Sequence, residues 1–494
     1  MTAMHHGLTR LDQMTKICLE GAGPAKPFAQ TLGRLKPPNP VHIQNITHAD
    51  VIQALHELSE TMRATSNLNG HADAGMTFFG QFVDHDITLD ATSALGTRID
   101  PATIPNIRTP SLDLDCVYGD GPEASPHLYG KGEQDHMLVF GRADNPLDLA
   151  RTPAGKALIG DPRNDENIIV AQVQGLFIEL HNILMSKIKE GGAVAGDIKG
   201  CAHDGMSAEV WENHVSPGLT SFQEVRRFIR LHYQWIVWNE LLKAFVQESC
   251  LDRAMSENIF GWDAPVMPVE FTGACYRFGH ATTQFEYQMN AGATPVGLFA
   301  TTGFGPRPAD ANMDMNMFFE MDNSNTCQKA RPVGPSMGSP LLELPFVNST
   351  IELAEIGETL TLAQSKNLAL RNMIRDRYTY QLASGQQFAA HLGTAAVDIP
   401  VPLAAKGFKK TPLWFYALQE AQQHGDGKLA GAGGLIVAAV FANLLKRDPT
   451  TYVHIPHFSP WGGFGGQPSC LAGIAHYVET NRGHIIDPDN LKSG

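Results

Sequence analysis

A short stretch near residue 80 places groups that can move protons among apolar side chains. Residues 80–90 read Gly-Gln-Phe-Val-Asp-His-Asp-Ile-Thr-Leu-Asp. If this stretch is helical, Gln81, Asp84 and His85 lie three or four residues apart and share one face. A histidine that can exchange a proton near neutral pH would then stand beside a carboxylate and an amide. Asp86 points elsewhere and could meet a cation.

A lone histidine in an apolar stretch is more often a buried side chain with ordinary hydrogen-bond partners, because an unpaired buried polar group is costly. Here the histidine does not stand alone. The Gln-x-x-Asp-His-Asp cluster that begins at Gln81 therefore favours a functional role.

A second motif, Asp161-Pro-Arg163-Asn-Asp-Glu166, opens a long helical segment. Arg163 presents a permanent positive charge on a planar fork of donors. A structural explanation is also available, because Asp165 and Glu166 would interact favourably with the positive end of the helix dipole. By itself this motif does not establish a function.

Oxygen-bearing side chains recur at every second position between residues 109 and 115. In an extended backbone these side chains lie on one side of the chain: Thr109, Ser111, Asp113 and Asp115. Such a row of oxygens suits a hard cation such as Ca²⁺, although the twelve-residue EF-hand pattern is absent. A polar edge strand with a solvated outer face would have the same pattern.

Two further motifs could hold a metal-binding group. His280 ends the sequence Tyr-Arg-Phe-Gly-His and could ligate a metal, although most histidines in such surroundings do not. Asn372 lies in a helical stretch, and its amide could hydrogen-bond the second nitrogen of a liganding histidine. Arg375 lies three residues on, on the same face, and could bind a carboxylate. A solvated charged helix face is the structural alternative.

The composition is that of a globular protein with a large core. The 494 residues are 43% hydrophobic and carry a formal net charge of −14, which argues against nucleic acid or an anionic membrane surface as partner. Seven scattered cysteines with no C-x-x-C spacing give no support to a zinc site and little to a disulfide framework. The N-terminus lacks the apolar core of a signal peptide, and no later apolar run predicts a membrane span. We expect a soluble protein that is cytoplasmic or secreted without a leader.

Hydrophobic periodicity predicts a mainly α protein with little β structure. Long loops are expected over residues 91–160 and 292–348, and neither an internal repeat nor a strand–helix alternation is apparent. Proline punctuates an irregular N-terminal arm over residues 1–45, so that the remaining domain is expected to cover 46–494. Besides the 80–90 element, helices are predicted at about 46–65, 166–189, 221–247, 351–376, 412–424 and 430–446.

Taken together and in their order along the chain, the five motifs resemble the animal-type haem peroxidase superfamily, the group of myeloperoxidase, lactoperoxidase and peroxidasin. Further support comes from Glu179-Leu-His181-Asn182 in the long helix, and the likeness runs from about residue 45 to 455. The compact length resembles the bacterial branch. The resemblance implies a single large helical catalytic domain with long loops.

The resemblance also implies roles for individual residues on the two faces of a haem. His85 would be the distal histidine, with Gln81 as its cavity neighbour and Arg163 as the distal arginine. His280 would be the proximal iron ligand, hydrogen-bonded by Asn372.

The remaining implied roles concern how the cofactors are held. Arg277 and Arg375 would attend the haem propionates, and Asp84 and Glu166 match the carboxylates that form ester links to methyl groups of a haem b-derived cofactor. A calcium ion would be bound by a set of oxygen ligands: Asp86, Thr109, Ser111, Asp113 and Asp115.

Two positions depart from the pattern of the family. Asn167 follows Glu166 where myeloperoxidase has a methionine joined to a haem vinyl group, so this third link is not expected. Asp115 stands where the mammalian calcium site has a serine, and it keeps an oxygen ligand while adding charge.

The resemblance implies a peroxidase that uses H₂O₂ to oxidise halides, thiocyanate or small phenolic and organic donors through a ferryl intermediate. A fatty-acid dioxygenase of the same superfamily is the alternative. Those enzymes place a radical tyrosine three residues before the proximal histidine, whereas Arg277 occupies that position here and Tyr276 lies four before. A non-enzymatic haem or adhesion module is the third reading, and retention of His85, Arg163 and His280 argues against it. The sequence does not determine the reducing substrate or the oligomeric state.

Overall fold

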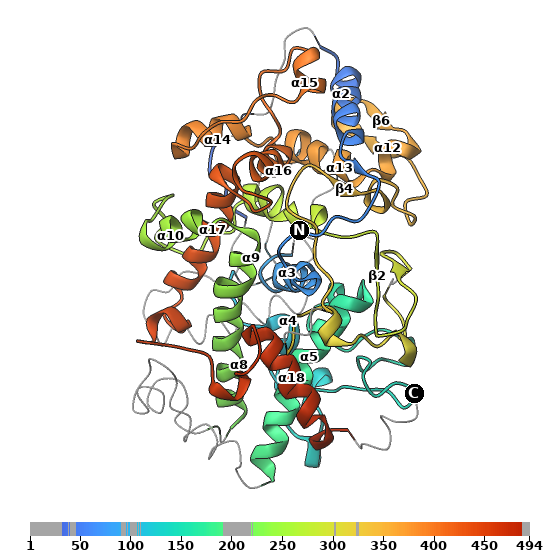
Figure 1. Ribbon diagram of the computed structural model, residues 1–494, viewed down its shortest axis with the longest axis vertical. Coiled ribbons are helices and arrows are strands. Elements are labelled where there is room, and N and C mark those ends of the chain that lie inside the picture. The colour runs from blue at the N-terminus through green and yellow to red at the C-terminus, as the bar shows by residue number, and fades with distance from the viewer. Residues whose placement is uncertain are drawn as a thin grey trace, which may run out of the picture.

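The protein consists mainly of helices joined by long loops (Figure 1). The computed structural model describes residues 32–37, 39, 46–89, 95, 97–98, 106, 108, 110–190, 219, 221–300, 303–322 and 326–486. Over these residues, strands form only two-stranded sheets: β1 (Arg63–Ala64) parallel to β4 (Met337–Gly338), and antiparallel pairs β2 (Glu286–Tyr287) with β3 (Val296–Gly297) and β5 (Ile351–Leu353) with β6 (Glu358–Leu360). The prediction of a mainly α fold is confirmed.

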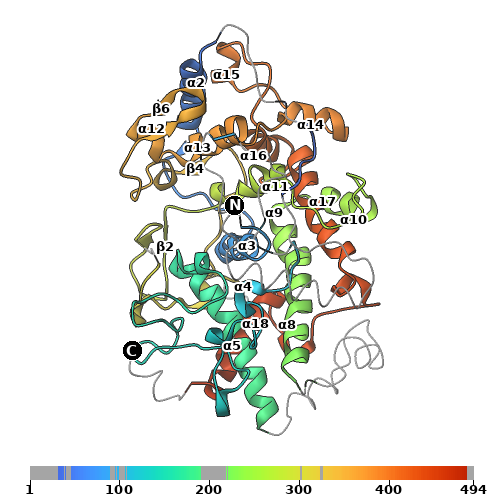
Figure 2. The same ribbon diagram turned by 180° about the vertical axis from the view of Figure 1, so that it is seen from behind.

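Helix α3 (Ala74–Ile87) lies at the centre of the molecule in both views (Figures 1 and 2). Its buried face packs against α5 (Ile168–Lys189) and the segment that continues α8 (Phe222–Ile236). Phe82 of α3 stacks on Phe177 of α5 with ring centroids 5.2 Å apart, and Tyr233 of α8 meets Phe82 edge-on at 6.1 Å. Buried aromatic rings contribute much of the apolar area of a core, so this cluster fixes the position of α3.

The other helices surround this centre. Those around the end of the molecule opposite α5 are α2 (His48–Glu60), α12 (Leu362–Lys366), α13 (Leu368–Ile374), α14 (Gly385–Leu392), α15 (Val401–Ala405) and α16 (Leu413–His424) (Figures 1 and 2). The rest are α4 (Asp115–Tyr118), α9 (Lys243–Phe245), α10 (Glu248–Ser256), α11 (Val269–Thr272), α17 (Gly431–Arg447) and α18 (Cys470–Asn481).

Two helices loosen into π-helical turns beside the central region. One turn, Val237–Leu242, continues α8 and contacts α3, and the other, Arg375–Thr379, continues α13. Single π turns are rare in proteins and are frequent at functional sites. The second one begins three residues after Asn372.

Within the described residues, α5 is the one helix that is long and apolar enough to cross a membrane, and 94% of its most apolar window is buried inside the fold. It packs against α3, α8 and α18. Its apolar surface is therefore accounted for by the core.

Carboxylates from other elements, two of them buried and that of Glu240 half-buried, cap the N-termini of three helices. Asp376 accepts from the Trp414 N–H of α16 at 3.0 Å, Glu420 from the Gly433 N–H of α17 at 2.9 Å, and Glu240 from the Leu471 N–H of α18 at 3.1 Å. These contacts satisfy N–H groups that a helix leaves unpaired. Burial raises the pKa of each of the three carboxyls to about 7.

The Glu420 carboxyl should make stability depend on pH. Its pKa in the folded state lies above the ordinary value of 4.5, so its contribution to stability is complete below about pH 4.5 and is lost as the pH rises to about 7. Glu420→Gln keeps a carbonyl acceptor and cannot ionise. We therefore expect the Tm of Glu420→Gln minus that of the parent protein to increase from pH 5 to pH 8, as measured by thermal unfolding. The exposed Glu355→Gln should show no such trend, and a Tm difference for Glu420→Gln that is the same at both pH values would contradict the prediction.

Two stretches differ from the sequence-based expectation. The helix predicted over 351–376 is wrong for its first part, where β5 and β6 form a hairpin around Gly357, whose φ of 69° suits a turn. Residues 109–115 are not a continuous extended strand, because Leu114 adopts a left-handed φ of 60° and α4 begins at Asp115. Local backbone turns therefore override the predicted helix in the first place and the alternating pattern in the second.

Candidate active site

The distal side of the candidate site is built on α3. His85 is buried, and its Nδ1 lies 2.7 Å from Asn164 Oδ1. One turn earlier, the Gln81 amide donates a hydrogen bond to the Glu166 carboxylate. The Asp84 carboxylate accepts from the Thr88 hydroxyl at 3.1 Å. The helical face predicted from the sequence is therefore present.

A short 3-10 helix, Pro162–Asp165, brings the second motif against α3. The buried Asp161 carboxylate accepts from the Arg163 backbone N–H at 2.9 Å and from its guanidinium at 2.8 Å. The same guanidinium donates to the backbone carbonyl of His85 at 3.0 Å. Arg163 is thus held beside the histidine by groups that only accept hydrogen bonds.

The outer side of the same turn is anchored by a buried ionic network. Arg151 forms a bidentate pair with Asp165, with N–O distances of 2.7 and 2.8 Å, and also donates to Asp148 at 3.0 Å. Bidentate arginine–carboxylate pairs fix geometry as well as charge. The backbone that carries Arg163 and Glu166 is therefore held from both sides.

The electrostatics leave the distal imidazole neutral near neutral pH. Burial and then the positive charge of Arg163 lower the pKa of His85 to about 4. Burial raises the pKa of Glu166 to about 6. A neutral histidine beside a cationic arginine can accept a proton, as a general base must.

The proximal side is built on another 3-10 helix, Cys275–Ala281, which carries His280. Burial and the charges of Arg277 and Arg375 lower the pKa of His280 to about 3, so its ring is neutral and able to ligate a metal. Asn372 Nδ2 lies 3.0 Å from His280 Nδ1, and Asn372 Oδ1 accepts from Arg375 at 3.2 Å.

The orientation of the Asn372 amide depends on Arg375. A histidine that ligates iron through Nε2 carries its proton on Nδ1 and needs an acceptor there. In the structure Arg375 binds Asn372 Oδ1, so the amide NH₂ faces His280 Nδ1, and only a half-turn of the amide would present Oδ1 there. The Arg277 guanidinium donates to the Thr272 carbonyl at 2.8 Å.

Two hydrogen bonds join the elements that carry the histidines. The Tyr276 hydroxyl donates to the Gly80 carbonyl of α3 at 3.1 Å, and the hydroxyls of Thr77 and Thr282 lie 2.8 Å apart. Gly80 precedes Gln81, and Tyr276 lies one turn before His280. The two histidines therefore belong to adjoining elements rather than to separate surfaces.

A cluster of carboxylates lies at the C-terminal end of α3. Oxygen atoms of Asp86, Asp113 and Asp115 lie within 4.8 Å of one another. Asp86 is fully buried and accepts from the Tyr233 hydroxyl at 3.0 Å and from the Leu114 N–H at 3.2 Å. Burial and the neighbouring carboxylates raise the pKa values of Asp86 and Asp115.

The other two oxygen ligands expected for a cation are placed differently. The Ser111 hydroxyl donates to Asp448 at 3.2 Å. Thr109 lies outside the described residues. Asp115 Oδ1 is buried and accepts no hydrogen bond, although Arg108 Nη1 lies 3.3 Å away.

Sequence reasoning missed two residues beside His85. It treated Asn164 as an unremarkable position between Arg163 and Asp165, yet its side chain meets the imidazole. Gln174 of α5 in turn meets Asn164 at 2.8 Å. The available indication was Gln174 itself, a polar residue at a position of α5 that the apolar pattern predicts to be buried.

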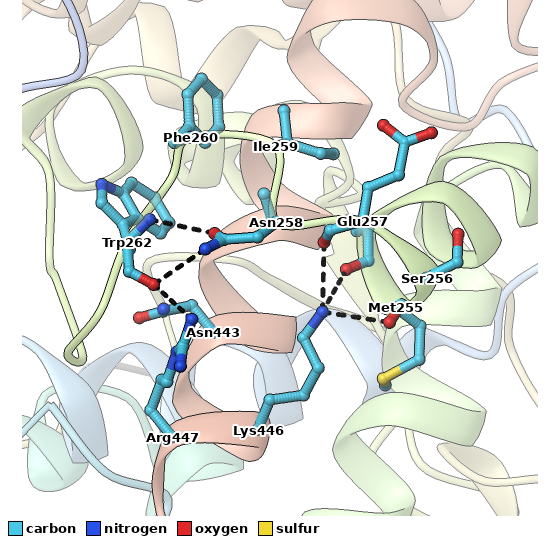
Figure 3. A pocket seen from close by; sticks show the side chains of 12 residues that line it. Met255, Ser256, Glu257, Asn258, Ile259, Phe260, Trp262, Asn443, Lys446 and Arg447 are labelled. Atoms are coloured by element: carbon cyan, nitrogen blue, oxygen red, sulfur yellow. Dashed lines mark hydrogen bonds between the residues drawn. The ribbon is translucent and has the colours of Figure 1, made fainter.

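A separate pocket of about 320 Å³ lies between the end of α10 and α17 (Figure 3). The Lys446 side chain lines this pocket, and its ammonium donates to backbone carbonyls of Met255 and Glu257 at 3.0 and 3.1 Å. Lysine bound to carbonyls that end a helix has a structural role. None of the distal or proximal residues lines this pocket.

Comparison with known proteins gives a family match over part of this chain. The sequence model of the animal haem peroxidase family matches residues 93–296, which include Arg163 and His280. The chorion peroxidase of Drosophila melanogaster is 28% identical over 195 residues, a match that covers 36% of this chain and 22% of that protein. The chain thus matches about a fifth of the length of this relative.

Solved structures share the fold at low sequence identity. Peroxidase A from Dictyostelium discoideum superposes with a TM-score of 0.57 at 15% identity, covering 90% of this chain and 94% of that one. The fatty acid alpha-dioxygenase of Oryza sativa gives 0.55 at 15% identity, covering 95% and 82%. That of Arabidopsis thaliana gives 0.56 at 14%, covering 92% and 76%. The family model matches less than half of this chain, and the solved structures, which include a peroxidase and fatty acid alpha-dioxygenases, show that the chain shares their fold.

Proposed function

We propose that this protein belongs to the haem peroxidase superfamily and is a haem-dependent peroxidase that reduces H₂O₂ and oxidises small anionic or phenolic donors. The observation that carries the proposal is the placement of His85, Arg163 and Glu166 on one side and the His280–Asn372 pair on the other, on adjoining elements.

The residues fit a haem. His280 offers a neutral nitrogen for the iron, and Arg277 and Arg375 put positive charge beside it, complementary to the carboxylates of the cofactor. Asp84 and Glu166 would supply the ester-forming carboxylates. Haem would supply the redox centre that links peroxide to the electron donor.

The distal residues would handle the protons and charge of peroxide. His85 would take a proton from one peroxide oxygen and return it to the other, which would leave as water, while bound haem would supply the two electrons that break the O–O bond. Arg163 stabilises negative charge that develops on the departing oxygen. The most direct test is an absorption spectrum of purified protein reconstituted with haem, followed by its reaction with H₂O₂ in the presence of bromide, thiocyanate or a phenol. Protein that stays colourless would contradict the proposal.

Fatty-acid dioxygenation is the second candidate. One observation favours it: the Tyr276 hydroxyl points from the proximal element to Gly80 on the distal helix. Arg277 still occupies the position three residues before His280, where the dioxygenases have their radical tyrosine. Oxygen uptake with linoleate that is abolished by Tyr276→Phe would support this function. Absence of uptake together with turnover of H₂O₂ would support the peroxidase.

The carboxylate cluster would bind Ca²⁺ through Asp86, Asp113 and Asp115, together with Thr109 and Ser111 if these approach the ion. Three carboxylates this close repel one another, and Arg108 Nη1, 3.3 Å from the buried Asp115 Oδ1, offsets only part of this effect, because burial and Asp113 still raise the pKa of Asp115. Oxygen-only donors match the preference of Ca²⁺. A cation there would tie the end of α3 to α4.

Removal of Ca²⁺ should therefore destabilise the protein. An ion present at a hundred times its dissociation constant contributes ~2.7 kcal/mol of stability. We expect a chelator to lower the Tm, Ca²⁺ to restore it and Mg²⁺ to do so poorly. Asp113→Asn should lose this response, whereas Asp120→Asn, at an exposed carboxylate, should keep it. A parent protein whose Tm changes with neither chelator nor Ca²⁺ would contradict the proposed calcium site.

A further inference from the structure

We propose that Asn164 and Gln174 are positioning residues that hold His85 in the tautomer with a proton on Nδ1 and a free lone pair on Nε2. The inference rests on the proposed peroxidase function and adds two residues to its proton-transfer machinery. Neither residue contacts a peroxide molecule in this scheme. Both would act through the imidazole of His85.

The geometry consists of a chain of three hydrogen bonds that ends on a backbone carbonyl. His85 Nδ1 lies 2.7 Å from Asn164 Oδ1, Asn164 Nδ2 lies 2.8 Å from Gln174 Oε1, and Gln174 Nε2 lies 3.3 Å from the carbonyl oxygen of Cys116. Asn164 and Gln174 are fully buried, so water does not compete for these bonds.

The carbonyl sets the direction of every bond in the chain. An amide end could be oxygen or nitrogen, and the partners decide which. The Cys116 carbonyl can only accept, so the Gln174 amide must present its NH₂ there and its oxygen to Asn164. Asn164 must then present its NH₂ to Gln174 and its oxygen to His85. The imidazole can satisfy that oxygen only with a proton on Nδ1.

The consequence concerns the other ring nitrogen. A neutral imidazole carries one proton, so Nε2 is left as the acceptor. General-base catalysis requires this lone pair, and a histidine held in the wrong tautomer loses its catalytic effect although its position is unchanged.

The residues that precede and follow Asn164 in the sequence have other hydrogen-bond partners. Arg163 is held by Asp161, and Asp165 by Arg151, so neither fixes the ring of His85. The Cys116 carbonyl that ends the chain also accepts from the Asp161 N–H at 3.2 Å, and the Cys116 N–H donates to Asp86 at 3.4 Å. The end of the chain is thus a fixed peptide unit of the core.

The test compares two ligands of the haem-loaded protein. Hydrogen cyanide gives up its proton when it binds, so its association requires a base, whereas carbon monoxide binds the reduced protein without proton transfer. We expect Asn164→Leu to slow cyanide association by about tenfold to a hundredfold, up to the lower end of the contribution of a positioned acid–base group because His85 itself is kept, and to leave carbon monoxide association unchanged. Both rates are measured by rapid-mixing absorption spectroscopy.

Two further variants separate positioning from packing. Asn164→Asp keeps an acceptor for the Nδ1 proton, and its cyanide rate should stay within about threefold of the parent. Gln174→Met should slow cyanide association, because the Asn164 amide is then free to turn. Gln172→Met is the matched control on the same helix, since the Gln172 amide meets Met313 and Ala311 instead. It should leave the rate unchanged.

The outcomes also separate this inference from the proposed function. If His85→Ala itself leaves cyanide association unchanged, the assignment of His85 as the base fails. If His85→Ala slows the reaction but Asn164→Leu and Gln174→Met do not, the positioning role is overturned. Equal slowing of cyanide and carbon monoxide association would show that the hydrogen-bonded chain acts only in packing. Equal loss of the cyanide rate in Asn164→Asp and Asn164→Leu would show the same. Either result would overturn the positioning role. If Asn164→Leu does not fold, Asn164→Asp and Gln174→Met decide the question by the same criteria.

Discussion

Replacement of His85 by alanine is expected to slow the reaction of the haem-loaded protein with H₂O₂ by at least ~10²-fold, the lower end of the contribution of a positioned acid–base group. The physical reason is the neutral state of this imidazole. Burial and Arg163 lower its pKa to about 4, so it has a lone pair available for a proton throughout the neutral range. No other histidine is hydrogen-bonded to the Arg163-bearing turn among the described residues.

Rapid-mixing absorption spectra of the haem band give the rate directly. His391→Ala is a suitable control, because His391 is exposed on α14, far along the chain from α3 and the turn at 162–166. The control should react at the parental rate, and carbon monoxide binding to reduced His85→Ala should stay normal if the cavity is intact. An unchanged peroxide rate in His85→Ala would remove this histidine from the mechanism.

The second large effect is expected at the two carboxylates assigned to ester links. If the proposed ester links form, haem in the parent protein should resist extraction by an acidified organic solvent. Asp84→Val and Glu166→Gln should each free one side of the haem, and the double variant should release it completely. Their side chains fit this role: Glu166 is bound by Gln81, and Asp84 lies on the same helix one turn before Thr88.

Solvent extraction followed by mass spectrometry of the peptide fraction measures both links. The double variant Asp120→Val and Glu133→Gln changes two exposed carboxylates outside the site and should retain haem as the parent does. Haem that is wholly extractable from the parent protein would contradict both esters. Release from neither single variant but from the double variant would be consistent with two independent links.

The amphipathic helices were predictable because each repeats its apolar residues along one face. The helix predicted at 166–189 is found at Ile168–Lys189, and that at 430–446 at Gly431–Arg447. The predicted helix at 221–247 contains the π turn at Val237–Leu242, which the periodicity did not reveal. The β5–β6 hairpin was missed although Ile351 and Leu353 have the two-residue spacing of a strand and Gly357 offers a turn.

The candidate site was predictable in its residue types and only partly in its contacts. The sharing of a face by Gln81 and His85 follows from helical spacing alone. The approach of Arg163 to the His85 carbonyl joins segments that are 78 residues apart, and no local pattern contains that distance. The row from Thr109 to Asp115 indicated a cation site, but the left-handed turn at Leu114 sets which carboxylates meet.

The sequence by itself determined the mainly α architecture, the chemical groups available and the order of the motifs, because periodicity and residue type are local properties. The tertiary structure alone decided which side chains lie together: Asn164 with His85, Gln174 with Asn164, and Asp86 with Asp113 and Asp115. Such partners are chosen when distant segments pack together, since a buried polar group must find a complementary donor or acceptor wherever the core places one.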